Sequence, residues 1–180
     1  MLAYAAGDVA AFEQLYALHR RALFQFLLNS CGNEAIAREH YQDVWLRVVK
    51  NRSSFQPGTP FNAWLYRIAR HRVIDHYRAQ KRVPPITAAS EMHDTYTNVS
   101  SLFAMPLMPD EIASLTQRSD SLSEALQLLP DVQREAVLLR HIAGMSVSEV
   151  ASVVNVGVET VKSRLRYAVV KLRSTLQEYS

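Results

Sequence analysis

The last helix that the sequence predicts carries charged side chains of the kind that read DNA bases. Its apolar residues recur at spacings of 4, 3 and 4 positions, at Val161, Leu165, Ala168 and Leu172. This spacing places them on one buried stripe and turns Glu159, Lys162 and Arg166 outward. A helix fits the major groove of duplex DNA, where a carboxylate accepts from cytosine and a lysine or arginine contacts guanine or phosphate. The outer face therefore has the chemistry to bind duplex DNA.

Another helix precedes this one across a tight turn. Ser146 and Glu149 form a Ser-x-x-Glu capping box at the start of an apolar run. That helix should end at Asn155, because asparagine tolerates the left-handed backbone of a tight turn, and Gly157 opens the last helix. The pattern predicts a helix-turn-helix. An ordinary helical hairpin with a solvated basic face is the alternative, but the cap, the turn residue and the basic face together favour DNA binding.

A further cluster of positive charge lies between residues 61 and 82. Six basic residues stand there against Asp75 alone: Arg67, Arg70, Arg72, Arg78, Lys81 and Arg82. Four aromatic residues are interleaved with them: Phe61, Trp64, Tyr66 and Tyr77. Basic groups that follow phosphates, with rings that stack on bases, suit single-stranded or melted nucleic acid. Trp64 lies on the apolar stripe of this helix, so we expect unstacked bases to enter the preceding loop, 52–60.

The helix that follows Asn33 has an outer face of mixed character. The residues opposite its apolar stripe are Gln42, Asp43, Leu46, Arg47 and Lys50. Mixed charge beside an outward leucine is a modest signal for docking of another protein. A solvated helix surface is equally compatible with this pattern.

The sequence offers no set of residues for catalysis or metal binding. Its six histidines form no His-Glu-x-x-His pair and no cluster with cysteine. No glycine-rich phosphate loop is present, and the lone Cys31 suits a small core residue in a reducing cytosol. We therefore expect no enzyme activity, no metal, no cofactor and no small-molecule substrate.

Composition suits a soluble globular chain, with 48% hydrophobic and 21% charged residues. The apolar runs are far shorter than the ~20 residues of a membrane span. Met1 to Gly7 lacks the basic-then-apolar order of a secretory signal. We expect a cytoplasmic protein.

Charge and helical periodicity divide the chain into three parts. Residues 1–82 hold twelve Lys+Arg and six Asp+Glu, residues 83–119 hold one and four, and residues 120–180 hold seven of each. Helices with caps at Asp8, Asn33 and Thr59-Pro60 fill the first part, and helices over 121–129 and 131–143 precede the helix-turn-helix in the third. The middle part is broken by prolines and lacks periodicity.

The prediction is an all-α protein, because no alternating strand pattern occurs. Two small helical domains, 1–82 and 120–180, are joined by an acidic flexible linker, 83–119. The second domain contains the helix-turn-helix.

Taken together, these blocks resemble a bacterial RNA polymerase sigma factor of the extracytoplasmic function (ECF) family. Residues 7–16, 42–48, 61–70 and 73–78 look like the promoter-melting domain of that family. Residues 129–136, 148–151 and 160–165 look like its second domain. Several ordered blocks at the expected separations make the match specific, and it covers nearly everything except the connector.

The resemblance implies a role for each surface. The implied minus-ten DNA-binding residues are Phe55, Asn62, Arg67, Arg70, His71, Arg78, Lys81 and Arg82. The implied minus-thirty-five DNA-binding residues are Glu159, Thr160, Lys162, Ser163, Arg164 and Arg166. The implied core-polymerase-binding residues are Gln42, Asp43, Leu46 and Arg47. Domain 1–82 would melt the promoter and bind the polymerase, and domain 120–180 would read the minus-thirty-five element.

The function that the resemblance implies is promoter-specific transcription initiation. The implied partners are core RNA polymerase, promoter DNA in duplex and melted form, and an inhibiting anti-sigma factor, often bound to the membrane. Three positions depart from the family pattern. His71 stands where asparagine is frequent, Asn155 replaces the usual turn glycine, and Gly157 replaces a polar cap.

Two other classes of function compete with this interpretation. A stand-alone helix-turn-helix regulator would bind one duplex site and ignore single strands, and the basic cluster between residues 61 and 82 argues against it. A protein-interaction module would use its helices only to bind partners. Loss of promoter-directed transcription after Arg78→Ala or Lys162→Ala, with folding intact, would exclude that module.

Overall fold

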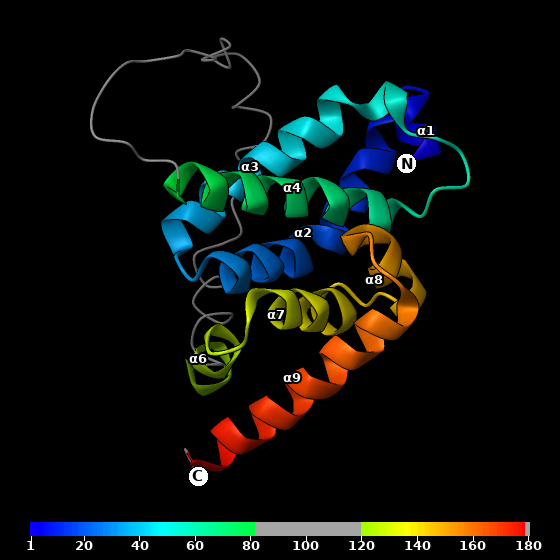
Figure 1. The fold of residues 1–180 in the computed structure, drawn as a ribbon. Coiled ribbons are helices and arrows are strands. Elements are labelled where there is room, and N and C mark those ends of the chain that lie inside the picture. Colours follow the sequence, from blue (N-terminus) through cyan, green and yellow to red (C-terminus); the bar gives the residue numbers. More distant parts are fainter. Residues whose placement is uncertain (82–119, 179–180) are drawn as a thin grey trace.

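Secondary structure is helical throughout the residues that the structure describes, 1–81 and 120–178 (Figure 1). In this computed structural model the first part of the chain forms α1 (Leu2–Ala5), α2 (Val9–Cys31), α3 (Glu34–Lys50), the short 3₁₀ turn η1 (Arg52–Ser54) and α4 (Phe61–Lys81). The second part forms α6 (Asp120–Gln127), α7 (Asp131–Val137), the π-helical turn η3 (Leu138–Ile142), α8 (Val147–Val154) and α9 (Val158–Glu178). The predicted all-α class is confirmed. The predicted linker, 83–119, lies outside the described residues.

Local side-chain caps fix where the first helices begin. The Asp8 side chain accepts a hydrogen bond from the backbone N–H of Ala11 at 3.2 Å, and the Asn33 side chain accepts one from Ile36 at 3.1 Å. Between them Gly32, with φ 64°, ends α2 in the left-handed conformation that glycine adopts without strain. Both predicted caps are confirmed.

Three helices differ from their predicted bounds, and the first of these is α6, which was predicted over 121–129 and spans Asp120–Gln127. Helix α4 begins at Phe61, after the proline predicted to open it, because the Pro60 carbonyl accepts the first helical bond from Trp64 N at 3.2 Å. The helix predicted over 131–143 is regular only to Val137. It continues as the wider turn η3, in which Ala143 N donates to the Leu138 carbonyl at 3.1 Å. Such π-helical turns are frequent at functional sites.

Helices α8 and α9 form the predicted helix-turn-helix. The Ser146 hydroxyl oxygen accepts from Glu149 N at 3.2 Å, and the Glu149 carboxylate accepts from Ser146 N at 2.8 Å. This is the predicted capping box. Asn155, with φ 56°, takes the left-handed conformation at the turn. Helix α9 then runs away from the turn as the long final helix in Figure 1.

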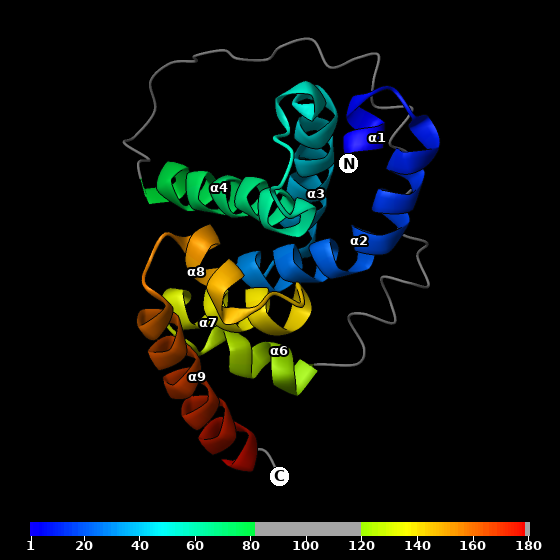
Figure 2. The same cartoon turned by 90° about the vertical axis from the view of Figure 1, so that its right-hand side faces the viewer.

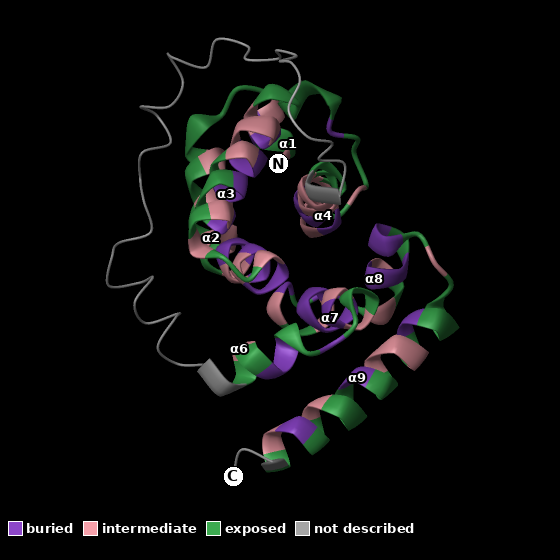
Figure 3. Ribbon diagram, turned by 60° about the vertical axis from the view of Figure 1, so that its left-hand side comes forward, coloured by how far each residue is buried: buried purple, intermediate pink, exposed green. Residues whose placement is uncertain are grey.

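The helices form two groups that share one apolar core. We call residues 1–81 the first group and residues 120–178 the second group. Helices α6 to α8 lie against α2 and α4 (Figure 2), and the buried faces of α2, α4, α7 and α8 turn toward one another (Figure 3). Buried residues of both groups belong to a single cluster, which includes Phe26, Tyr66, Leu139 and Met145. We call this contact the seam, and the sequence patterns did not predict it.

None of the helices within residues 1–81 and 120–178 combines the length and the apolar character that crossing a bilayer requires.

Candidate nucleic-acid interface

Helix α9 turns its predicted duplex-reading residues outward. The stripe residues Val161 and Ala168 have no exposed surface and hold the helix on the second group. On the other side the exposed members of the predicted set are Glu159, Thr160, Lys162 and Arg166, and the partly exposed members are Ser163 and Arg164. The structure therefore brings all six onto one accessible part of a helix, which begins directly after the turn.

Electrostatic contacts on this face are weak enough to exchange for DNA. The Lys162 ammonium lies 2.7 Å from the Glu159 carboxylate, but both side chains are more than half exposed. Ion pairs in such positions typically contribute less than about 1 kcal/mol, because water competes for each charge. The Arg166 guanidinium lies 5.2 Å from the centre of the Tyr167 ring and extends over it. Both cations can therefore reach a phosphate or a base at little cost.

The basic face of α4 is only partly open to solvent. His71 and Arg78 are exposed, and Arg67 is half-buried. The Lys81 side chain and Arg82, which complete the predicted set, lie outside the described residues. The accessible part of this face thus consists of residues spaced along the outer side of α4.

Two of the predicted single-strand-binding residues point into the seam. The Asn62 side-chain amide donates to the Ala143 carbonyl at 2.7 Å. The Arg70 guanidinium donates to the Glu135 carboxylate, also at 2.7 Å, and about a fifth of each side chain is exposed. In this arrangement the Asn62 side-chain N–H and the Arg70 guanidinium both donate to the second group.

Arg72 does not join the DNA-facing cluster that its sequence position indicates. Its guanidinium lies 2.8 Å from the Asp43 carboxylate and 3.1 Å from that of Glu39. Arg47 adds a third ion pair, 3.2 Å from Asp43. The two Arg72 contacts tie α3 to α4 and neutralise Arg72, so its charge stabilises the protein rather than a phosphate.

The predicted polymerase-binding face on α3 is therefore shaped by this ionic network. Gln42 is exposed, whereas Asp43, Leu46 and Arg47 are half-buried. Leu46, which the sequence pattern places on the outer face of the helix, is less exposed than that position indicates. Leu46 precedes Arg47 in the sequence and follows Asp43 by three residues, and both of these belong to the network.

The loop over residues 52–60 packs on aromatic side chains of α4 through Phe55. Phe55 is 8% exposed, and its ring centre lies 5.4 Å from that of Trp64 in an edge-to-face contact and 6.4 Å from that of Phe61. The neighbouring residues 52–54 and 56–58 are exposed. Phe55 therefore lies on the buried side of the loop. A base that enters the loop would contact backbone and polar groups first.

A buried histidine in the first group was not singled out from the sequence. His40 is 1% exposed, and its ring centre lies 4.9 Å from that of His76. Burial lowers the pKa of His40, and the nearby charge of Arg72 lowers it further. His40 is therefore a neutral core residue of α3. Its place among the buried positions of the α3 stripe was the available signal.

Cys31, at the end of α2, is a partly buried free thiol. Burial raises the pKa of Cys31 to about 11, so it stays protonated at neutral pH. Among the described residues no group of three or more histidine, cysteine or acidic side chains is arranged to hold a metal ion.

Comparison with protein families gives two matches along the chain. Residues 15–83 match Sigma-70 region 2, and residues 119–172 match Sigma-70 region 4. Among curated proteins, the RNA polymerase sigma factor CarQ of Myxococcus xanthus is 32% identical over 96% of this chain and 92% of its own length. The ECF RNA polymerase sigma factor SigW of Bacillus subtilis is 27% identical over the same shares.

Solved structures agree with these matches. CnrH, solved in complex with the cytosolic domain of CnrY, has a TM-score of 0.67 and 29% identity, with 98% of this chain and 94% of that chain covered. The fold also resembles RpoE of Bartonella quintana, solved with the anti-sigma factor NepR. For RpoE the TM-score is 0.71 at 21% identity, with 94% of this chain and 98% of that chain covered.

Proposed function

This chain belongs to the extracytoplasmic function family of RNA polymerase sigma factors, and we propose that its two helical groups divide promoter recognition between them. As a member it binds core RNA polymerase and directs transcription initiation at specific promoters. In the proposed division, residues 1–82 bind the polymerase and open and read the minus-ten element. Residues 120–180 read the minus-thirty-five element. Such a factor supplies recognition, and the chemistry of RNA synthesis remains with the polymerase in the cytoplasm.

The observation that carries this proposal is the outer face of α9. Six residues able to contact bases or phosphates project from the first turns of a helix that follows a capped helix and a tight turn. This is the geometry with which helix-turn-helix proteins enter the major groove. We propose Glu159, Lys162 and Arg166 as the central contacts, with Thr160, Ser163 and Arg164 beside them.

For the minus-ten element we propose the face of α4 and the loop before it. Arg67, His71 and Arg78 would follow the phosphates of the opened strand along the helix. Asn62 and Arg70 would join them once released from the second group, with Phe55 under the loop, and Lys81 and Arg82 complete the proposed set. Basic residues spaced along one helix suit a single strand, because its backbone can follow the helix while its bases turn aside.

Core polymerase would dock on α3. We propose Gln42, Asp43, Leu46 and Arg47 as the contact, with Leu46 as its apolar centre. The ion pairs of Asp43 with Arg72 and Arg47 hold the polar groups around that leucine in one arrangement. A preformed surface of this kind loses less side-chain entropy on binding.

We also propose control by an anti-sigma factor, which we expect to be bound to the membrane. CnrH was solved with the cytosolic domain of CnrY bound to it. In this chain a cavity of about 480 Å³ lies between α2, α4 and α7, and its apolar lining includes Phe26, Ile74 and Val132. An apolar side chain of an inhibitor could bury itself there while its charged residues meet Arg78 at the rim.

Run-off transcription with bacterial core polymerase on genomic fragments tests the proposal. We expect discrete transcripts with the chain and none without it. Lys162→Ala should reduce those transcripts at least about fivefold, since one phosphate or base contact is lost. Lys171→Ala removes another exposed charge elsewhere on α9 and should leave them unchanged. If both variants behave alike, or the chain directs no initiation, the proposed division of labour is refuted.

A further inference from the structure

Arg52 is an exposed cation at the start of the loop over residues 52–60, and it belongs to none of the surfaces proposed above. It opens the turn η1, which is followed directly by Phe55 packed on α4. Backbone bonds hold this turn, because the Ser54 N–H and the Ser54 hydroxyl both donate to the Asn51 carbonyl, at 3.0 and 2.8 Å. The backbone that carries Arg52 is therefore fixed, while its side chain stays accessible.

The Arg52 side chain lies against the first helix of the chain. The central carbon of its guanidinium is 5.6 Å from the centre of the Tyr4 ring, within the ~6 Å over which a cation is attracted to an aromatic face. Figures 1 and 2 both show α1 beside the turn that joins α3 to α4, and α1 packs on η1 there. The two residues come from distant parts of the sequence, so no local pattern predicts this contact.

Tyr4 is in turn anchored in the core of the first group. It is 5% exposed, and its ring centre lies 4.9 Å from that of Phe12. Phe12 meets Trp45 of α3 edge to face, with ring centres 5.8 Å apart, and Trp45 is 1% exposed. Because these rings pack in series, Tyr4 cannot leave η1 without breaking contacts in the core. It therefore gives the Arg52 guanidinium a fixed support.

This contact differs in kind from those of other arginines in the first group. Arg70 and Arg72 lie against carboxylates, which neutralise them. Arg52 lies against a neutral ring, and that contact leaves its positive charge in place. A guanidinium is planar and can stack on a ring through either face. With Tyr4 on one side and solvent on the other, Arg52 has the arrangement in which arginine stacks on an unpaired nucleobase.

We propose that Arg52 stacks on an unstacked base of the promoter strand at the start of this loop and that Tyr4 is the positioning residue that holds it there. The exposed Ser53 and Gln56 belong to the same loop and carry groups that can bond a base edge. The contact adds α1, through Tyr4, to the parts of the chain on which strand recognition depends. This inference rests on the proposed function, because it requires that the loop receives a base.

Arg52→Lys separates stacking from simple attraction of charge, because lysine keeps the charge and loses the plane. The substitution is at an exposed position, so the fold should be unaffected. The assay is fluorescence anisotropy of a single-stranded oligonucleotide with the minus-ten sequence of a promoter found by run-off transcription, measured with the chain on saturating core polymerase. We expect at least about fivefold weaker binding, the lower end of the range for stacking on one base. Unchanged affinity would overturn the stacking contact.

Abasic oligonucleotides identify the base and exclude a merely structural role. Where the contacted base is missing, Arg52 has nothing to stack on, so the unsubstituted chain and Arg52→Lys should bind equally. An abasic site at any other position should leave the difference between them in place. A difference that persists at every position would contradict the proposal, because it would show that Arg52 acts on the loop and not on a base.

Two substitutions at Tyr4 test the positioning role. Tyr4→Phe keeps the ring and should bind the strand as the unsubstituted chain does. Tyr4→Leu removes the ring and should weaken binding about two- to fivefold, as expected for the loss of one exposed cation–ring contact. Thermal unfolding establishes that both variants are folded at the assay temperature. Equal affinities of the two variants would refute the role of Tyr4.

Arg38→Ala is the matched control for loss of charge. Arg38 is exposed near the start of α3, whereas η1 follows the end of that helix, and it pairs with Glu34. Arg52→Ala removes the same charge and should weaken strand binding more than Arg38→Ala does. Equal losses would mean that only net charge matters and would overturn the proposal. If the unsubstituted chain on core polymerase binds no strand and starts no transcript, the proposed function itself is refuted.

Discussion

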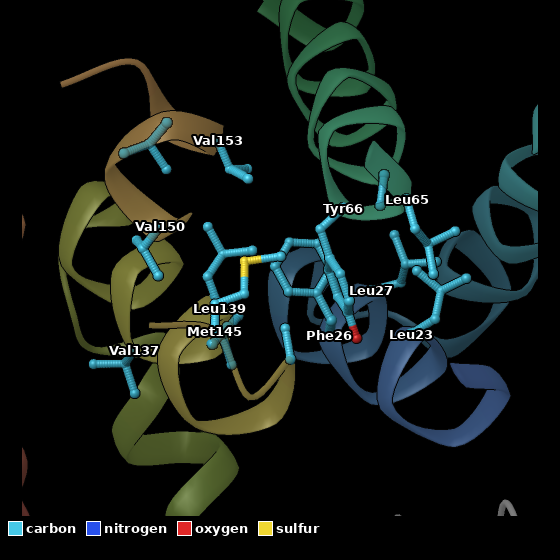
Figure 4. Packing of buried hydrophobic residues seen from close by; sticks show 14 of the residues in the cluster. Leu23, Phe26, Leu27, Leu65, Tyr66, Val137, Leu139, Met145, Val150 and Val153 are labelled. Atoms are coloured by element: carbon cyan, nitrogen blue, oxygen red, sulfur yellow. The ribbon is translucent and has the colours of Figure 1, made fainter. Parts of the chain in front are cut away.

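Met145 offers the most direct test of whether the two helical groups share one core in solution. Its side chain has no exposed surface, although it sits on a short segment between η3 and α8. Much of its cover comes from Phe26 and Tyr66 of the first group (Figure 4). If the groups were apart, this methionine would lie on the surface of the second group and contribute little to stability.

Met145→Ala should therefore lower the free energy of unfolding by about 2–5 kcal/mol, the range for removing a large buried aliphatic side chain. For a chain of this size each kcal/mol corresponds to a change of roughly 2–4 °C in the melting temperature. We expect a fall of roughly 4–20 °C. The sulfur contact with the aromatic rings adds to the loss.

Urea denaturation followed by circular dichroism measures this change. Leu128→Ala is the control, because Leu128 is 52% exposed on the same group and its truncation should cost under about 0.5 kcal/mol. A shared core also requires both groups to unfold in one transition. A Met145→Ala cost as small as that of Leu128→Ala, or two separate transitions of which only one responds, would refute the reasoning.

Three further predictions follow from single sites. Ser146→Ala removes the capping box of α8 and should lower the free energy of unfolding by about 1 kcal/mol, measured by thermal unfolding. The bonds from Ser146 lower the pKa of Glu149, so the stability that Glu149 contributes is lost as pH falls through this lowered pKa. Ser146→Ala should make that loss smaller. His40 has a pKa below the 6.5 of a free histidine, so as pH falls the unfolded chain binds a proton first and stability should fall below about pH 6.5. His40→Gln should therefore reduce the change of the urea midpoint between about pH 8 and pH 5.5. Substitution of the exposed His141 by Gln should not reduce it. Asn155→Ala should cost about 1 kcal/mol because alanine is strained at φ 56°, while Asn155→Gly should be nearly neutral in the same assay.

The parts of the fold that the sequence predicted are those set by nearby residues. The caps at Asp8, Asn33 and Ser146 each use a side chain and a backbone N–H three residues away, so their spacing is visible in the sequence. The apolar stripe of α9 is similarly local. The turn η3 is different, because residues 131–143 keep a helical pattern of apolar residues, while η3 packs on α2, which lies far away in the sequence.

The candidate sites were predictable to different degrees for the same reason. The α9 face needs only one helix and one stripe, and Glu159, Lys162 and Arg166 are exposed as the pattern predicts. The α4 face depends on what covers it. Helical spacing places Asn62, Arg70 and Arg72 among polar residues, but their partners come from elsewhere in the chain and divert them to the seam or to α3. No sequence pattern in residues 61–82 predicts that Ala143, Glu135 and Asp43 are these partners.

Accessibility therefore suggests an order for promoter recognition, given the roles proposed above. The α9 residues are exposed while the groups are closed, so the minus-thirty-five contact does not require the seam to open. Asn62 and Arg70 become available only after Ala143 and Glu135 release them. The two proposed surfaces therefore depend on different residues, and Glu135→Gln, which removes the charged partner of Arg70, can separate them. It should change binding of a single strand and leave binding of the duplex minus-thirty-five element as it was, which fluorescence anisotropy with the two DNAs would measure.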